Sequence, residues 1–252
     1  MRTFHNDLDF DEAYKTSWFS VDRCWISCGS HCCTFRSIVK HFRLFRDPGA
    51  VLPLFPGEFE FLEAKGVLQQ GFKETRREVN VPIPGSSGDQ AGFSFDFVTC
   101  RLEGACSFPQ WRPLVCRLYP LLPRIDDAGH VLNFLPIAYQ DLFWKDLGVE
   151  DPCLVRLNAK FQEETLRSLE CLLSKRMGRF CLGAASIVME AIYRRVSESA
   201  REEIASGPDA FFRRLEAMSL RGQLFDKKRV LQKVADWRRK VFEDISASGS
   251  GT

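Results

Sequence analysis

The cysteines are the residues of this chain whose type and spacing most suggest chemistry, and they are unevenly distributed. Of the 10 cysteines in 252 residues, most fall into two groups in the first half of the chain. The early group comprises Cys24, Cys28, Cys32 and Cys33, and the later group comprises Cys100, Cys106 and Cys116. Closely spaced thiolates are ligands for Zn²⁺ and for iron–sulfur clusters. We therefore predict that both groups contribute to a metal centre.

The early group is the denser of the two, because four thiols lie between Cys24 and Cys33. Gly29 lets the backbone follow a tight path there. A loop of this kind supplies several ligands from one short segment, and the later group supplies the rest. The thiols of both groups exceed one tetrahedral zinc set, so either a second centre exists or some of them are not direct ligands. Zinc and an iron–sulfur cluster both remain candidates.

The later group lies in a stretch with a distinctive order of residues. It reads Cys106-Ser-Phe-Pro-Gln-Trp-Arg112-Pro113-Leu-Val-Cys116-Arg117-Leu-Tyr119-Pro120. Together with the early run that ends in Cys32-Cys33, this stretch resembles the YkgJ-like zinc- or iron-chelating cysteine-cluster family, whose later motif has Arg, Pro, Cys, Arg and Pro in the same order. Three residues separate Cys28 from the cysteine pair, a spacing closer to that of the related flagellin lysine-N-methylases. The resemblance covers roughly residues 20 to 125.

The resemblance implies a site built from both cysteine groups, with zinc or iron as the metal. The methylase relatives imply S-adenosylmethionine as a methyl donor and a protein or peptide lysine as the acceptor, which would make the chain a metal-dependent transferase. The sequence has no Gly-rich loop of the type that binds nucleotides. Two other functions therefore remain open: a non-catalytic, zinc-stabilised interaction module, and a redox or metal-handling protein.

Several charged residues accompany the cysteines. Arg112 and Arg117 flank Cys116, where guanidinium groups would stabilise thiolates, so we predict that they contact the cofactor; a surface ion pair is the alternative. His31 lies inside the early group and is either a ligand, a proton shuttle or an exposed loop residue. Glu58 and Glu60 stand at a predicted helix start, where acidic side chains suit the helix dipole without any further role.

Turns and loops dominate the chain up to about Pro123. Glycine and proline clusters punctuate it, including Pro84-Gly85. A short helix is expected at Glu58–Lys65. Alternating, β-branched or aromatic residues predict three strands: Arg77–Pro82, Phe93–Thr99 and Val131–Ile137. A small antiparallel sheet threaded between cysteine loops fits this pattern.

The rest of the chain has helical periodicity. Four helices are expected: Leu154–Lys175, Ala184–Ala205, one beginning near Pro208, and Asp226–Ile245. We therefore predict an α+β fold with three parts: a loop-rich cysteine-cluster metal module at residues 1–150, a helical lobe at 151–245 and a flexible tail at 246–252. The three remaining cysteines are expected in the core: Cys153, Cys171 and Cys181.

Net charge and the distribution of charged residues limit which kinds of partner and which location we expect. The formal net charge is only +2, so no nucleic-acid partner is expected. The basic side chains of the last helix alternate with acidic ones and are interpreted as a solvated face. Charged residues interrupt every apolar run, which predicts no membrane span, and the first residues do not have the pattern of a secretory signal. A cytoplasmic location is expected, where thiols remain reduced.

Overall fold

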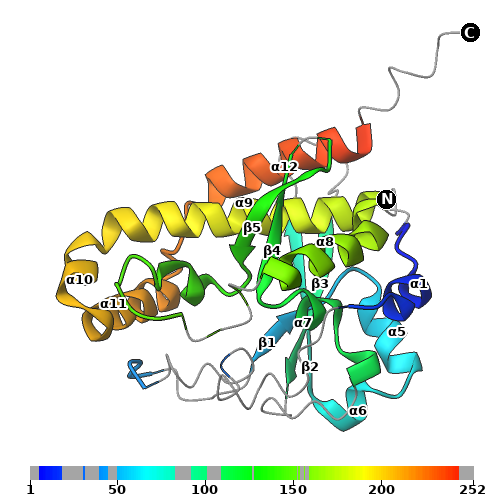
Figure 1. Cartoon of the computed structure of the whole chain (residues 1–252), viewed down its shortest axis with the longest axis horizontal. Coiled ribbons are helices and arrows are strands. Elements are labelled where there is room, and N and C mark those ends of the chain that lie inside the picture. The colour runs from blue at the N-terminus through cyan, green and yellow to red at the C-terminus, as the bar shows by residue number, and fades with distance from the viewer. Residues whose placement is uncertain are drawn as a thin grey trace, which may run out of the picture.

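The computed structural model of the chain describes residues 6–18, 31, 40–44, 50–82, 92–100, 109–126, 128–151, 153, 156 and 159–243. Five of the predicted metal ligands lie outside the described residues: Cys24, Cys28, Cys32, Cys33 and Cys106. Figure 1 shows the described helices and strands in their spatial arrangement.

The first sheet has three antiparallel strands in the order β1-β3-β2. Its strands are β1 (Val51–Pro53), β2 (Phe72–Pro82) and β3 (Gly92–Cys100). The central strand β3 pairs with both neighbours, for example Val98 with Leu52 and Phe95 with Val79. The predicted small antiparallel sheet is confirmed, and the expected strands Arg77–Pro82 and Phe93–Thr99 lie within β2 and β3.

A separate two-stranded hairpin joins β4 (Leu121–Ile125) to β5 (Val131–Pro136). The side chain of Asp126 holds the turn by accepting hydrogen bonds from the backbone N–H groups of Ala128 and His130, at 2.9 and 2.8 Å. The expected strand at Val131–Ile137 is confirmed as β5. Its partner β4 was not predicted, because Pro120 and Pro123 interrupt the alternation on which that prediction depends.

Short helices precede, connect and follow the strands in the first part of the chain. They are α1 (Phe10–Lys15), α5 (Glu58–Ala64), α6 (Leu68–Gly71) and α7 (Leu114–Leu118), together with the 3₁₀ helices η1 (Pro109–Trp111) and η2 (Tyr139–Phe143). The expected helix at Glu58–Lys65 is confirmed as α5. The helix α1 was not predicted; Asp9 caps it by accepting a hydrogen bond from the N–H of Glu12 at 2.9 Å.

Longer helices form the second part. They are α8 (Ala159–Leu173), α9 (Arg176–Ser199), α10 (Arg201–Ser206), α11 (Pro208–Leu220) and α12 (Lys227–Glu243). Helix α9 spans the molecule, with α12 along one side of it (Figure 1). The expected helical second half is confirmed. None of the described helices is long and apolar enough to cross a membrane.

Helix α9 begins eight residues earlier than the expected Ala184, because two glycines hide the helical pattern. A Cβ at Gly183 would lie 2.3 Å from the indole of Trp237, so only glycine allows α12 to approach this closely. The Trp237 indole N–H also donates to the Phe180 carbonyl at 3.2 Å. Close helix–helix contact, rather than helix propensity, therefore explains the glycine.

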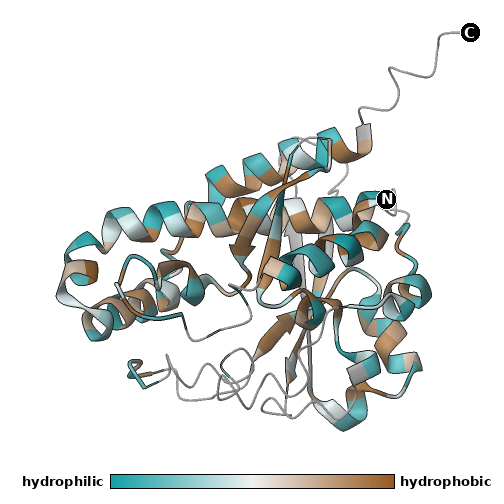
Figure 2. Ribbon diagram, in the orientation of Figure 1, coloured by the Kyte–Doolittle hydropathy of each residue, from teal (hydrophilic) through white to brown (hydrophobic). Residues whose placement is uncertain are grey.

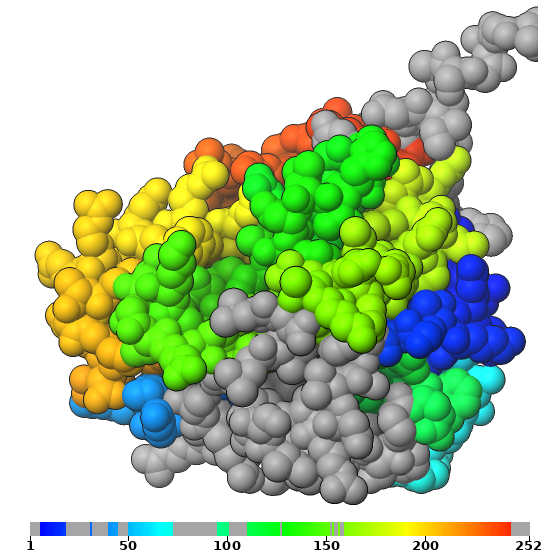
Figure 3. Space-filling view, viewed as in Figure 1, coloured from blue at the N-terminus to red at the C-terminus, as the bar shows by residue number. Residues whose placement is uncertain are grey.

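The hydrophobic core is continuous across both parts of the chain. Leu62 and Leu118 from the first part belong to the same buried cluster as Leu182 and Phe211 from the second. The hairpin β4–β5 packs on α9, and the space-filling view shows the hairpin beside α8 on this face (Figure 3). Hydrophilic residues colour the outer side of α12 in Figure 2. The basic side chains of α12 are mostly exposed, as the solvated-face interpretation expects.

Candidate functional site

Two of the predicted metal ligands lie within the described residues. Cys100 ends β3, and its backbone N–H donates to the carbonyl of Ala50 at 2.9 Å. Cys116 lies in α7, which packs against β1. Both thiols are half-buried. Strand β1 therefore has both cysteine-bearing elements as neighbours, since it pairs with β3 and contacts α7.

A buried carboxylate, that of Asp141 in η2, gathers residues from distant segments. Its Oδ1 lies 2.8 Å from Nε2 of His31 and accepts from the Trp144 indole N–H at 3.1 Å. Its Oδ2 accepts from the Tyr119 hydroxyl at 2.8 Å. Asp141 is 3% exposed and His31 is 1% exposed. A carboxylate only accepts hydrogen bonds, so Nε2 of His31 carries a proton here.

Arg156 balances the charge of this cluster. Its guanidinium donates to Oδ2 of Asp141 at 2.6 Å and lies 3.0 Å from Oδ2 of Asp151. Burial alone would raise the pKa of Asp141, but hydrogen bonding and charge from His31 and Arg156 outweigh it and hold the pKa below its ordinary value. Burial instead dominates at Asp151, whose pKa is raised. We therefore expect Asp141 to be ionised at neutral pH.

The Asp141 cluster ties together the two segments that carry the predicted ligands. His31 lies 110 positions before Asp141 and is flanked in sequence by Cys28 and Cys32. Tyr119 lies 22 positions before Asp141 and follows Cys116 by three residues. One carboxylate thus binds a residue from the early cysteine run and a residue from the later motif.

A second buried carboxylate, that of Glu58, holds the other end of the later motif. Its Oε1 accepts from the Tyr14 hydroxyl and from the backbone N–H of Leu114, each at 2.7 Å, and its Oε2 accepts from the N–H of Phe55 at 2.9 Å. Glu58 is 0% exposed. Burial raises its pKa and outweighs these hydrogen bonds, which lower it. Glu58 therefore caps the first turn of α7 by binding the N–H of Leu114, which lies two residues before Cys116.

The two predicted cofactor-binding arginines brace the backbone around α7. The guanidinium of Arg112 donates to the Cys116 carbonyl at 3.1 Å. The Nε of Arg117 donates to the Arg112 carbonyl at 2.9 Å, and the same guanidinium lies 4.6 Å from the centre of the Tyr14 ring. Both side chains place positive charge next to Cys116 while they fix the course of the loop.

The donor set among the described residues is incomplete for a metal ion. In the ranges that the structure describes, His, Cys, Asp and Glu nowhere gather in a group of three or more that could hold one. Cys100 and Cys116 are half-buried thiols, the kind of donor that a thiolate centre uses, and the guanidinium group of Arg112 contacts the backbone of Cys116. Two thiols are fewer than a zinc or iron–sulfur centre needs, so such a centre would require further ligands.

The other cysteines follow expectation in part. Cys153 and Cys181 are buried, at 6% and 8% exposed, which confirms their placement in the core. Cys171 on α8 is half-buried, and its thiol donates to the Ser168 carbonyl at 3.1 Å. Burial raises the pKa of both Cys171 and Cys181, so these thiols are poorly suited to metal binding at neutral pH.

Sequence reasoning missed most of the buried polar residues. Asp141 and Arg156 received no role, and Glu58 was assigned only a contribution to the helix dipole. A signal for Asp141 is present in the run Tyr139-Gln-Asp-Leu-Phe-Trp144, where an acid stands among aromatic residues. An acid in apolar surroundings needs buried partners. The local sequence does not identify those partners.

The chain matches no protein-family model, no curated protein and no solved structure.

Proposed function

We propose that this chain is a metal-binding cysteine-cluster protein of the YkgJ-like type, whose centre draws thiolates from both the early and the later cysteine groups. The supporting observation is the convergence of His31 and Tyr119 on Asp141. Thiolate ligands approach zinc to roughly 2.3 Å, so segments that share a centre must be held side by side. The Asp141 cluster supplies such a tie between the two segments.

The charges around the later motif support the same proposal. Glu58 fixes the start of α7, and Arg112 and Arg117 place positive charge beside Cys116. Positive groups near thiolates lower their pKa and favour the ionised form that binds metal. A bound iron–sulfur cluster would supply electron transfer or an open iron site, whereas zinc would act as a structural clamp. We favour the iron–sulfur centre, because the predicted thiols outnumber one closed zinc set.

Metal analysis of anaerobically purified protein tests the proposal. We expect stoichiometric metal, visible absorption and acid-labile sulfide if the centre is iron–sulfur, and colourless protein with zinc if it is structural. Removing the metal with a chelator should lower the melting temperature, because a structural site can couple on the order of 10 kcal/mol to folding. A metal-free protein with the same melting temperature as the purified form would contradict any coupling between metal and folding.

Single cysteine variants locate the centre. Cys116→Ser should lose metal, because its thiolate is a proposed ligand. Cys171→Ser is the matched control, since Cys171 is also half-buried but lies on α8 with its thiol on a helix carbonyl. Full metal content in both variants would overturn the role of the later group. Methyl transfer from S-adenosylmethionine to a protein lysine, which the resemblance implies, is the reaction to assay in the metal-loaded protein.

A further inference from the structure

Helix α12 concentrates positive charge. It contains seven basic and two acidic residues, a net charge of +5, whereas the formal net charge of the whole chain is only +2. The remainder of the chain is therefore net negative. The expectation of no nucleic-acid partner rested on the charge of the whole chain, which averages over this separation. A local cluster of charge is the better guide to a charged partner.

The charge is least balanced in the first two turns of the helix. Lys227, Lys228, Arg229 and Lys233 lie within a single short segment, and all four are exposed. In the part of the chain that the structure describes, no carboxylate pairs with any of these four side chains. Their positions span about 9 Å along the helix axis, which is roughly the screening length at physiological salt. The four charges therefore act together on a ligand.

Two acids of the same helix region are already engaged. Asp226 accepts from the backbone N–H of Arg229 at 3.0 Å and so caps the helix. Asp236 accepts from the Gln232 amide at 3.1 Å and pairs with Arg239. Because Asp226 occupies the helix end, the positive surface is made by side chains and not by the backbone of the helix N-terminus.

The placement of these cations does not serve the helix itself. The N-terminal end of the helix dipole is positive, so acidic side chains stabilise a first turn and basic ones a last turn. The first turn of α12 has no acidic residue and instead contains Lys227, Lys228 and Arg229. Residues that oppose a local rule are expected where function requires them. The first turn of α12 therefore indicates a role in binding rather than in stability.

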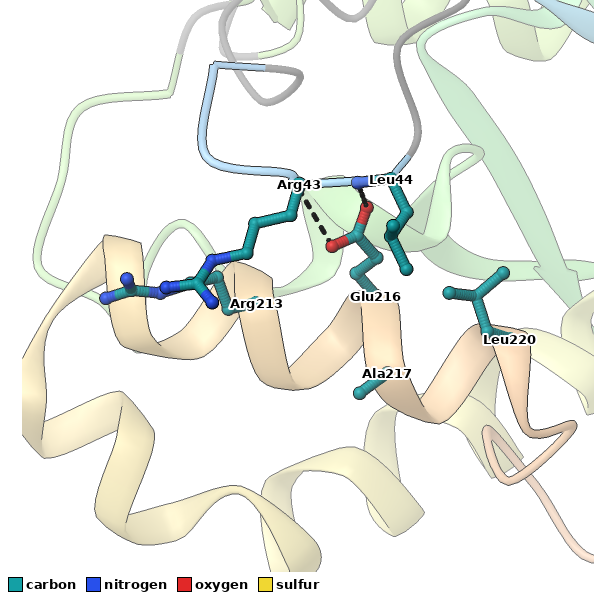
Figure 4. A pocket seen from close by; sticks show the side chains of 6 residues that line it. All are labelled: Arg43, Leu44, Arg213, Glu216, Ala217 and Leu220. Atoms are coloured by element: carbon teal, nitrogen blue, oxygen red, sulfur yellow. Dashed lines mark hydrogen bonds between the residues drawn. The ribbon is translucent and has the colours of Figure 1, made fainter.

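The neighbouring helix α11 shows a different arrangement, in which basic and acidic groups lie together. A pocket lies between α11 and the segment that carries Arg43 (Figure 4). Its acid, Glu216, accepts from the backbone N–H of Arg43 at 2.9 Å. The pKa of Asp209 on the same helix is lowered by its hydrogen bond to His41 and by nearby charge, which includes that of Arg213. The first turns of α12 have no such balance.

The rest of α12 determines which anionic partner fits. Its apolar residues Val230, Val234 and Trp237 are buried in the core, and its outer side is hydrophilic (Figure 2). The exposed side therefore offers charge without an apolar anchor. The centre of a specific protein interface is apolar, and stable attachment to a membrane needs a second anchor besides basic charge. Charge alone is sufficient for non-specific binding to nucleic acid.

We infer that Lys227, Lys228, Arg229 and Lys233 bind the phosphate backbone of double-stranded nucleic acid without sequence preference. A single strand is bound largely by stacking of its bases on aromatic side chains. The indole of Trp237 on α12 is buried and donates to the Phe180 carbonyl at 3.2 Å, so it is not available for stacking. The inference does not depend on a metal and is tested separately from the proposed function.

Fluorescence anisotropy with labelled DNA duplexes tests the inference. The logarithm of the affinity should fall linearly with the logarithm of the salt concentration, with a slope of up to about −3.6, because each of four phosphate contacts contributes about 0.9. Duplexes of different sequence should bind equally, since phosphates carry no sequence information. No binding at about 100 μM protein, the weak end of non-specific affinities, would overturn the inference. Binding to phosphatidylserine vesicles without binding to the duplex would also overturn it.

Matched double variants separate α12 from net charge. Lys227→Ala with Lys228→Ala should reduce the salt slope by about two, because each lost phosphate contact removes about one. The melting temperature should not fall, since the lost cations oppose the helix dipole. The control, Lys15→Ala with Lys145→Ala, removes the same charge from exposed positions on α1 and after η2, and should leave the slope unchanged. Equal changes in both double variants would show that α12 is not the binding surface.

Discussion

Two buried acids, Asp141 and Glu58, each hold the later cysteine motif on one side of Cys116, but they do so with different partners. Asp141 binds Tyr119 on one side of Cys116 and has His31 and Arg156 as partners, which lower its pKa. Glu58 binds the backbone of Leu114 on the other side and is held by a phenol and backbone N–H groups, so burial raises its pKa.

The difference shows what a buried acid needs to remain charged. At Glu58, hydrogen bonds and the charge of Arg117 do not offset the loss of hydration, whereas the hydrogen bond and charge of His31 and the charge of Arg156 together do so at Asp141. The charged cluster joins segments that are far apart in sequence, and the Glu58 cluster positions a single helix turn. We expect the first to be the more sensitive to substitution.

Asp141→Asn should have the largest effect on stability. The amide cannot balance Arg156, so a buried charge loses its main partner, and breaking such pairs costs about 3–5 kcal/mol. Urea denaturation measures the loss. Glu170→Gln at an exposed position on α8 is the control and should leave the midpoint unchanged. A midpoint for Asp141→Asn equal to that of the wild type would show that the cluster does not hold the fold together.

Glu58→Gln should have a smaller effect. The substitution keeps the size of the side chain but turns its amide N–H₂ toward backbone or phenol donors, leaving one of them unsatisfied at a cost of about 1–3 kcal/mol. The same denaturation series gives this value. A loss as large as that of Asp141→Asn would mean that the two carboxylates are equivalent and would remove the contrast between them.

The pH dependence of stability should separate the two acids by sign. The pKa of Asp141 is lowered in the folded protein. Its contribution to the free energy of unfolding is therefore complete above the unfolded-state pKa of about 3.9 and is lost as the pH falls through the folded-state pKa. The pKa of Glu58 is raised in the folded protein. Its contribution to the free energy of unfolding is therefore complete below the unfolded-state pKa of about 4.3 and is lost as the pH rises through the folded-state pKa.

Denaturation midpoints measured against pH test these signs. Asp141→Asn should reduce the fall in the midpoint that occurs as the pH is lowered. Glu58→Gln should reduce the fall that occurs as the pH is raised. Curves for both variants that run parallel to the wild-type curve would show that neither group titrates with a shifted pKa.

Substitution of the two tyrosines that bind these acids should cause the smallest losses of stability. Tyr119→Phe and Tyr14→Phe each remove one hydrogen bond to a buried carboxylate that retains other donors, at a cost of about 0.5–1.5 kcal/mol. Tyr119→Phe should lose more, because its acceptor is charged. Thermal melts of the two variants make the comparison, and a larger loss from Tyr14→Phe would reverse the assignment of charge.

Local sequence patterns were sufficient for much of the fold. The periodicity of apolar residues predicted α8, α9 and α12, and alternation predicted β2, β3 and β5, because one face of each element packs against the core. The position of Pro208 predicted the start of α11. The predictions failed where packing overrode the local pattern. Gly183 is tolerated in α9 because Trp237 occupies the space of a side chain, and β4 forms despite its prolines because it pairs with β5.

The sequence by itself also identified Cys100 and Cys116 as candidate ligands and grouped Arg112 and Arg117 with them, since their types and spacing carry that information. It did not identify the acids that position this motif. Glu58 lies 56 positions from Leu114, and Asp141 lies 110 positions from His31. Only the tertiary structure decided these partners, because the partner of a buried charge depends on which distant segments the folded core brings together.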